Sequence, residues 1–257
     1  AADTFQADVA VKAGRVVALG ENLGTADQEI EAAGKLVLPG GVEGHCHIEQ
    51  KSSSSTSGVM TADDFYSGTV SAAFGGTTTV IPFAAQYRGQ SLRQTVEDYH
   101  ACAGPKAVID YGFHLIISDP TEQVIGQELP ALIKDGYTSF KVYMTYDSLR
   151  LDDYQMLEVL SAARREGAMV MVHAENHDMI RWLSQKLLDG GHWQPQYHAV
   201  SHSRVGEGEA AHRAIALSRL MDQPILVVHV SSEEAMDEIR LAQNKGLKIF
   251  AETCPQY

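Results

Sequence analysis

The run Lys35-Leu-Val-Leu-Pro-Gly-Gly-Val-Glu-Gly-His-Cys-His47 decides how the rest of the chain is interpreted. Its apolar part predicts a short buried strand, with glycines that loosen the end of that strand. Side chains two residues apart on a strand point to the same side, so the imidazoles of His45 and His47 can face one point in space. Neutral imidazole is the commonest protein ligand for metals such as zinc. A solvated pair, or a hydrogen-bonded pair in the core, is the alternative for these two histidines.

Short apolar strands and amphipathic helices alternate from residue 36 onward. Strands are predicted at Leu36–Pro39, Thr77–Phe83, Tyr111–Ile117, Ser139–Met144, Met169–His173, Ile225–Val230 and Leu247–Ala251. Helices are predicted at Ala62–Phe74, Ser91–Cys102, Glu122–Lys134, Asp153–Glu166, His177–Leu188, Gly208–Met221 and Ser232–Asn244, with Thr61 as a start signal for the first.

Strands rich in Val and Ile that lack polar alternation are typical of a parallel sheet buried on both faces. They recur about every 30 residues in the middle of the chain, which is the size of one βα unit. The predicted fold class is therefore α/β. We expect residues 36–257 to form a (β/α)8 TIM-type barrel that is incomplete, with about seven βα units and the last one missing. An open doubly wound sheet is the alternative, and this number of strands would make it unusually wide.

Residues 1–35 have a different pattern. Ala7–Val11 and Val16–Leu19 flank a turn that contains Gly14, which predicts a β-hairpin. Two or three strands bury little apolar surface, so we expect this segment to be a fragment of a small β-sandwich domain.

Composition narrows the class of partner. The chain has 257 residues, with 33 acidic and 20 basic side chains and a net charge of −13, which disfavours nucleic acid and acidic membranes as partners. A small-molecule substrate fits better. Cys46, Cys102 and Cys254 form no CxxC pair, and neither a signal peptide nor a membrane-spanning run is apparent. These features predict a cytoplasmic protein.

Polar side chains gather where the predicted strands end. His45 and His47 follow the first strand, Lys141 lies within the fourth, His173 ends the fifth and His229 ends the sixth. Catalytic groups of a TIM-type barrel collect at this end of the strands. A single strand histidine is more often a core residue, and a lysine inside an apolar strand is costly unless it is paired or neutral. Four imidazoles and a lysine at one end of parallel strands are hard to explain by packing.

Five motifs resemble the dihydropyrimidinase and D-hydantoinase branch of the amidohydrolase superfamily, in the same order along essentially the whole chain. They are Gly41-Val-Glu-Gly-His-Cys-His47, the segment 61–79, Ser139-Phe-Lys-Val-Tyr-Met-Thr-Tyr146, Val172-His-Ala-Glu-Asn176 and Val228-His-Val-Ser231.

This resemblance implies two divalent metal ions, usually zinc, bridged by an N-carboxylated Lys141. By position, His45, His47 and Lys141 hold the first ion, and Lys141, His173 and His229 hold the second. The activated water attacks the amide of a cyclic substrate. Tyr146 matches the family tyrosine whose hydroxyl stabilises the oxyanion, with simple packing as the alternative role. The family also implies a homotetramer.

Several positions depart from the family pattern. Glu43 stands where the family usually has Asp, and Cys46 replaces the common Thr. The stretch Glu49–Gly58, with its serine-rich part 52–57, replaces an apolar loop near the substrate, and either a flexible loop or a substrate-facing role is possible. Ser203–Glu209 keeps the family's Ser-Arg and Glu but lacks its proline pair.

The family's last metal ligand is an Asp that also acts as general base, and it falls beyond Tyr257. We therefore expect a truncated chain that is inactive by itself. Two alternatives to a dihydropyrimidine- or hydantoin-opening enzyme stay open. One is another cyclic amidase such as an allantoinase, and the other is a non-catalytic dihydropyrimidinase-related interaction protein. The survival of all five visible ligand positions favours descent from an active enzyme.

Overall fold

The structure, a computed structural model, describes residues 4–51 and 59–257. It divides into two compact units, Ala1–Pro39 and Gly40–Tyr257. The serine-rich stretch 52–57, for which a loop or a substrate-facing role was predicted, lies outside the described residues. In the part of the chain that the structure describes, no helix combines the length and apolar character needed to cross a bilayer.

The first unit contains the predicted hairpin. Strands β1 (Asp8–Lys12) and β2 (Arg15–Gly20) pair antiparallel across a two-residue turn. Both turn residues, Ala13 and Gly14, have positive φ, as hairpin turns of the primed type require. That this unit is a fragment of a small β-sandwich domain stays a prediction.

The predicted strand at Leu36–Pro39 is wrong. Leu36, Val37 and Leu38 are exposed and form no strand, and the first strand of the second unit is β3 (Gly41–Cys46). Pairing with the neighbouring strand begins at the Gly41 N–H, which donates to the Gly76 carbonyl at 2.9 Å. An apolar run alone does not create a buried strand, because burial requires another element to cover it.

The second unit alternates strands and helices. After β3 come α1 (Phe65–Phe74), β4 (Thr77–Ala85), α2 (Leu92–Ala103), β5 (Asp110–Tyr111), β6 (His114–Ile116), a π-helical turn η1 (Val124–Glu128), α3 (Leu129–Lys134), β7 (Ser139–Tyr143), α4 (Asp153–Glu166) and β8 (Met169–His173). They are followed by α5 (His177–Asp189), the 3₁₀ turn η2 (Pro195–Tyr197), α6 (His198–Ser201), α7 (Arg204–Met221), β9 (Ile225–Val227), α8 (Glu233–Asn244) and β10 (Ile249–Ala251).

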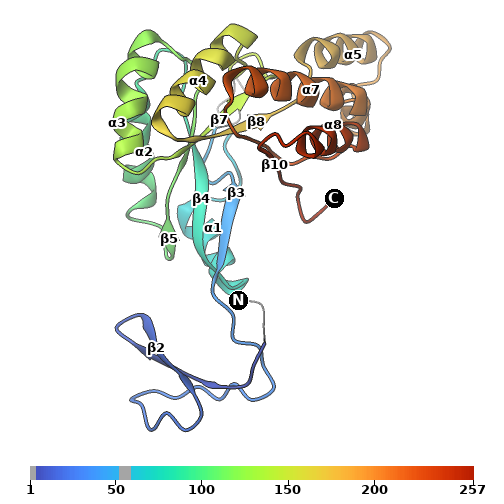
Figure 1. The fold of residues 1–257 in the computed structure, drawn as a ribbon. Helices are drawn as coiled ribbons and strands as arrows, with labels where there is room; N and C mark the ends of the chain where they lie inside the picture. The colour runs from blue at the N-terminus through green and yellow to red at the C-terminus, as the bar shows by residue number, and fades with distance from the viewer. Residues whose placement is uncertain (1–3, 52–58) are drawn as a thin grey trace. The chain divides into compact units, whose positions relative to one another are not determined.

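Within the described residues, seven strands form one parallel sheet in the order β10-β9-β8-β7-β6-β4-β3, and the short β5 pairs with β4 at the side. Helices α2, α3, α4, α7 and α8 lie around the outside of this curled sheet (Figure 1). The fold is an incomplete TIM-type barrel, which confirms the predicted class. Strands β3 and β10 stand at the two ends of the strand order.

Successive side chains of each strand point to opposite faces of the sheet. In β7, Phe140 and Val142 pack into the large cluster shared with the helices, whereas Tyr143 belongs to a second cluster on the opposite face. Lys141 is paired in register with Ile116 and Met171, and both are members of the second cluster. The inner face of the curled sheet therefore carries the lysine.

The starts of α1 and α7 each lie three or more residues from the predicted ones. Asp64, not Thr61, caps α1, because its side chain accepts from the Ser67 N–H and the Ser67 hydroxyl oxygen accepts from the Asp64 N–H. Helix α7 begins at Arg204, before the predicted Gly208, with the Ser203 side chain as its cap. The glycines in its first turns obscured the helical pattern.

Candidate active site

The parallel sheet brings five predicted side chains to one end of its inner face. His45 is the last residue but one of β3, and His47 follows that strand directly. Lys141 lies in the middle of β7, His173 is the last residue of β8, and His229 comes two residues after β9. Side chains from four strands meet here because parallel strands have their carboxyl ends at the same edge of the sheet.

The four imidazoles form a continuous row. Ring centroids are 5.7 Å apart for His47 and His45, 5.3 Å for His45 and His229, and 4.6 Å for His229 and His173. Phe83 of β4 contacts both His45 and His47, at centroid distances of 4.8 and 4.9 Å, so the two rings lie on the same side of the chain.

Lys141 points into this row and is 1% exposed. Its Nζ lies 3.0 Å from Nε2 of His45 and 4.2 Å from the centroid of the Phe83 ring. Among the described residues, no carboxylate forms an ion pair with it. Burial lowers the pKa of Lys141 to about 7, although the charge of Glu252 acts in the opposite direction. A neutral amine is therefore accessible near neutral pH.

The β3 histidines are each held through Nδ1 by an oxygen that sequence reasoning did not identify. Nδ1 of His45 contacts the carboxylate of Glu252, which directly follows β10. Nδ1 of His47 lies 2.6 Å from Oε1 of Gln50. The sequence could have identified Glu252, because this residue follows a predicted strand just as the histidines do. No sequence pattern pointed to Gln50.

Tyr146 and Glu175 complete the far end of the row. The Tyr146 ring lies 5.1 Å from that of His173, whose Nε2–H donates to Glu175 at 2.7 Å. Burial raises the pKa of Tyr146 to about 12, with Glu175 adding to the effect, so its hydroxyl stays protonated and can donate. Tyr146 and His229 both have positive φ, at 69° and 41°. Such non-glycine conformations are costly and gather at functional sites.

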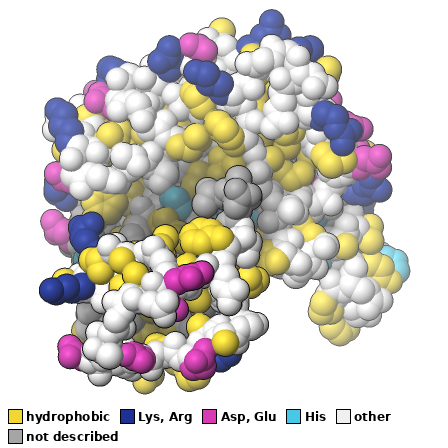
Figure 2. All heavy atoms as spheres, turned by 60° about the horizontal axis from the view of Figure 1, so that its bottom comes forward, with side chains coloured by type: hydrophobic (Ala, Val, Ile, Leu, Met, Phe, Trp, Pro, Cys, Tyr) yellow, Lys and Arg dark blue, Asp and Glu magenta, His cyan; other side chains and the backbone are white. Residues whose placement is uncertain are grey.

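A pocket of about 390 Å³ lies at this end of the sheet, a size that suits a small-molecule substrate. Its lining residues are His47, Gln50, Lys51, Met60, Thr61, Lys141, Tyr143, Tyr146, Leu149, His173 and His229. Figure 2 shows Lys, Arg, Asp and Glu side chains spread over the outer surface of that face, with histidine side chains both in a recess and at the edge.

The donor chemistry fits divalent metal ions. Burial lowers the pKa of His47 to about 4 and that of His229 to about 2, so both rings are neutral and able to bind metal at pH 7. In residues 4–51 and 59–257, no three His, Cys, Asp or Glu side chains are by themselves grouped as a metal site.

Cys46, between the two histidines, faces the other way. It packs against the large core cluster, and burial raises the pKa of its thiol to about 12. The thiol therefore stays protonated and is a packing group.

The chain is similar in sequence to known proteins. The sequence model of the Amidohydrolase family matches residues 36–249. The D-hydantoinase of Geobacillus stearothermophilus is 46% identical over 260 residues, which cover 100% of this chain and 54% of that protein. The D-hydantoinase of Ralstonia pickettii is 43% identical over 253 residues, covering 98% of this chain and 54% of that protein.

Among solved structures, dihydropyrimidinase from Brevibacillus agri NCHU1002 matches with a TM-score of 0.94 at 42% identity, covering 100% of this chain and 55% of that one. The chain thus spans about half the length of the relatives that it matches.

Proposed function

We infer the function from one premise: this chain belongs to the amidohydrolase family. We propose that the protein containing it hydrolyses the ring amide of dihydropyrimidines or 5-substituted hydantoins. The names of its relatives, D-hydantoinase and dihydropyrimidinase, support this class of cyclic substrate.

The observation that carries the proposal is the environment of Lys141. A fully buried lysine whose Nζ faces an imidazole nitrogen at 3.0 Å, rather than a carboxylate, is unfavourable as a structural element. It is well suited to react as a neutral amine with carbon dioxide. The amine nitrogen would form a bond to the carbon of carbon dioxide and release one proton, and the carbamate so formed would offer two oxygen donors to metal ions beside the histidines.

In this proposal His45, His47 and N-carboxylated Lys141 hold one divalent metal ion, and N-carboxylated Lys141, His173 and His229 hold the other. The ions, which we propose to be zinc, supply Lewis-acid polarisation of the amide carbonyl and a water that ionises near neutral pH. Tyr146 donates its hydroxyl proton in a hydrogen bond to the oxyanion that develops on the substrate. Glu252 and Gln50 fix the ring orientations of His45 and His47.

The test is Lys141→Ala in the full-length protein, with metal content and hydantoin ring opening measured together. We expect loss of both metal ions and at least about a thousandfold loss of turnover, about 4 kcal/mol in barrier. Lys186→Ala, on the exposed face of α5, is the matched control and should change neither. A short carboxylic acid added to Lys141→Ala should restore part of the activity. Normal occupancy by two metal ions in Lys141→Ala would exclude the carbamate bridge.

The same premise leads us to propose a homotetramer for the full-length protein, which sedimentation equilibrium would test. A cytoplasmic location stays a prediction.

A further inference from the structure

The chain makes an unusual turn directly after β3. Glu49 has a φ of 50°, a left-handed conformation that residues with a β-carbon seldom adopt. Three hydrogen bonds hold it, two between backbone groups and one to a side chain. The Glu49 N–H donates to the Asp63 carbonyl at 2.9 Å, the Gln50 N–H donates to the Thr61 hydroxyl at 3.0 Å, and the Thr61 N–H donates to the Gln50 carbonyl at 2.9 Å. A turn that is unfavourable locally and fixed from several sides indicates a functional demand on its geometry.

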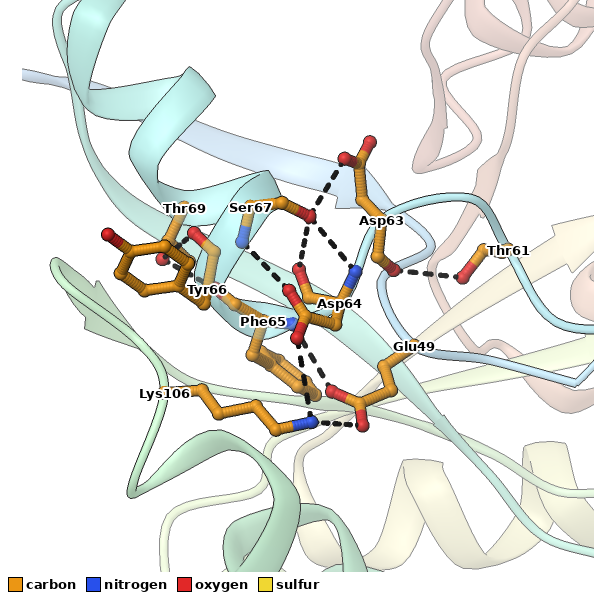
Figure 3. Close-up of polar contacts among 9 residues, drawn as sticks. All are labelled: Glu49, Thr61, Asp63, Asp64, Phe65, Tyr66, Ser67, Thr69 and Lys106. Carbon is orange, nitrogen blue, oxygen red and sulfur yellow. Dashed lines mark hydrogen bonds and ion pairs between the residues drawn. The ribbon is translucent and has the colours of Figure 1, made fainter.

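The side chain of Glu49 anchors the turn to the start of α1 (Figure 3). Its Oε2 accepts from the Phe65 N–H at 3.2 Å, and its Oε1 pairs with the ammonium of Lys106. Lys106 also lies 3.7 Å from the cap residue Asp64. A carboxylate at a helix N-terminus is stabilised by the unpaired N–H groups and the helix dipole there. Glu49 therefore ties the segment after β3 to a rigid element.

The consequence of the turn is that the side chain of Gln50 folds back onto His47. Oε1 of Gln50 lies 2.6 Å from Nδ1 of His47, and Gln50 is only 8% exposed. An amide oxygen can accept a hydrogen bond but cannot donate one. Nδ1 of His47 must then carry the ring proton, which leaves the lone pair on Nε2. His47 and Gln50 both line the pocket.

We propose that Gln50 is a positioning residue that selects the Nδ1-protonated form of His47, and that the Glu49–Lys106 pair holds Gln50 in place to do so. The use of Nε2 as a metal ligand rests on the proposed function. The choice of tautomer does not, because it follows from the hydrogen bond alone. The resemblance does not explain Gln50, since it stands at the start of the stretch where relatives were expected to have an apolar loop.

The direct measurement is ¹⁵N NMR of the metal-free full-length protein labelled at histidine, because the ring nitrogen shifts report which nitrogen is protonated. Wild-type His47 should be protonated at Nδ1. Gln50→Leu, which removes the acceptor and keeps the bulk, should convert this signal to a mixture of tautomers. Gln50→Glu keeps an acceptor and should restore the wild-type signal, and Gln185→Leu on the exposed face of α5 should leave it unchanged.

Lys106→Met tests the anchor and should shift the His47 signal in the same direction as Gln50→Leu, to a smaller extent. If Gln50→Leu does not fold, Gln50→Met provides a more adaptable side chain without an acceptor. A wild-type His47 that is unprotonated at Nδ1, or a signal identical in wild type and Gln50→Leu, would overturn the proposal.

Zinc affinity, measured by competition with a chromophoric chelator, separates this inference from the proposed function. We expect Gln50→Leu to weaken zinc binding by about 10- to 100-fold and Gln50→Glu to recover most of it. If the wild type binds no zinc but shows the predicted tautomer and its loss in Gln50→Leu, the proposed function fails and the positioning role stands. If zinc binds equally well in wild type and Gln50→Leu and the His47 signal is also the same in both, the positioning role fails and the proposed function stands.

Discussion

The imidazole of His45 and the carboxylate of Glu252 are in hydrogen-bond contact, although they come from opposite ends of the strand order. His45 lies in β3 and Glu252 directly follows β10, so the sheet curls until the carboxyl ends of its two outermost strands meet. The contact engages Nδ1 of His45 and leaves its Nε2 facing Lys141.

This contact predicts that Glu252 controls the orientation of the His45 ring. Glu252→Leu in the full-length protein should weaken zinc binding by about 10- to 100-fold, because the ring loses the acceptor that holds it. Glu252→Gln keeps an acceptor oxygen and should lose less. Glu97→Leu, on the exposed side of α2, is the control. Equal zinc affinities in wild type and Glu252→Leu, measured by chelator competition, would contradict the role.

Tyr146 is predicted to act on the reacting carbonyl and not on the metal ions. Tyr146→Phe should lower kcat by about 100- to 1000-fold, which is typical for removal of one oxyanion donor, while metal content stays unchanged. Because the pKa of its hydroxyl is about 12, activity should not fall through ionisation of Tyr146 below pH 10. Tyr154→Phe, on an exposed position of α4, provides the matched control. A Tyr146→Phe enzyme with wild-type kcat would show that the ring only packs.

The pKa shifts of Lys141 and His47 predict two separate pH windows for the stability of the metal-free protein. The pKa of Lys141 is lowered from 10.5 to about 7, so between these values the unfolded chain binds a proton that the folded chain does not. The free energy of unfolding should therefore rise with pH from about 7 to about 10, by on the order of a few kcal/mol. Below pH 7 this contribution is absent.

The pKa of His47 is lowered from 6.5 to about 4, which has the same sign at lower pH. Stability should decline as pH falls from 6.5 to 4, because in this range the unfolded chain binds a proton at His47 that the folded chain does not. Urea unfolding at a series of pH values tests both windows. Lys141→Met should flatten the upper window alone, and His47→Asn should reduce the slope of the lower one. A slope above pH 7 that survives in Lys141→Met would assign it to another group.

Gly208 is predicted to be required for the packing of α7 against α8. A β-carbon at this position would lie 2.8 Å from Cβ of Glu234, closer than two carbon atoms can approach. Gly208→Ala should therefore destabilise the fold by about 1–3 kcal/mol in urea unfolding, against the usual preference of helices for alanine. A β-carbon at Gly126, by contrast, would meet nothing within 4 Å, so Gly126→Ala is the control. A Gly208→Ala protein as stable as wild type would mean that the two helices separate easily.

Local pattern was sufficient for much of the fold. The strand Met169–His173 and the helix Asp153–Glu166 have the predicted bounds. The spacing of their apolar residues, the N-cap Asp152 and the C-cap Gly167 are all visible within a few residues of sequence. The candidate site was accessible for a related reason. Parallel strands share one carboxyl edge, so polar residues after apolar runs, such as His173 and His229, are expected to meet without knowledge of the coordinates.

What the sequence by itself determined is therefore the set of elements and the residues at the end of each strand. Only the tertiary structure decided that Leu36–Leu38 is exposed, that Glu252 reaches His45, and that Gln50 folds back onto His47. Each of these depends on an interaction between distant parts of the chain: a covering element, the curl of the whole sheet, and a left-handed turn at Glu49 fixed by α1. Such contacts have no periodic signature, because the partners are separated by distances along the chain that no local pattern spans.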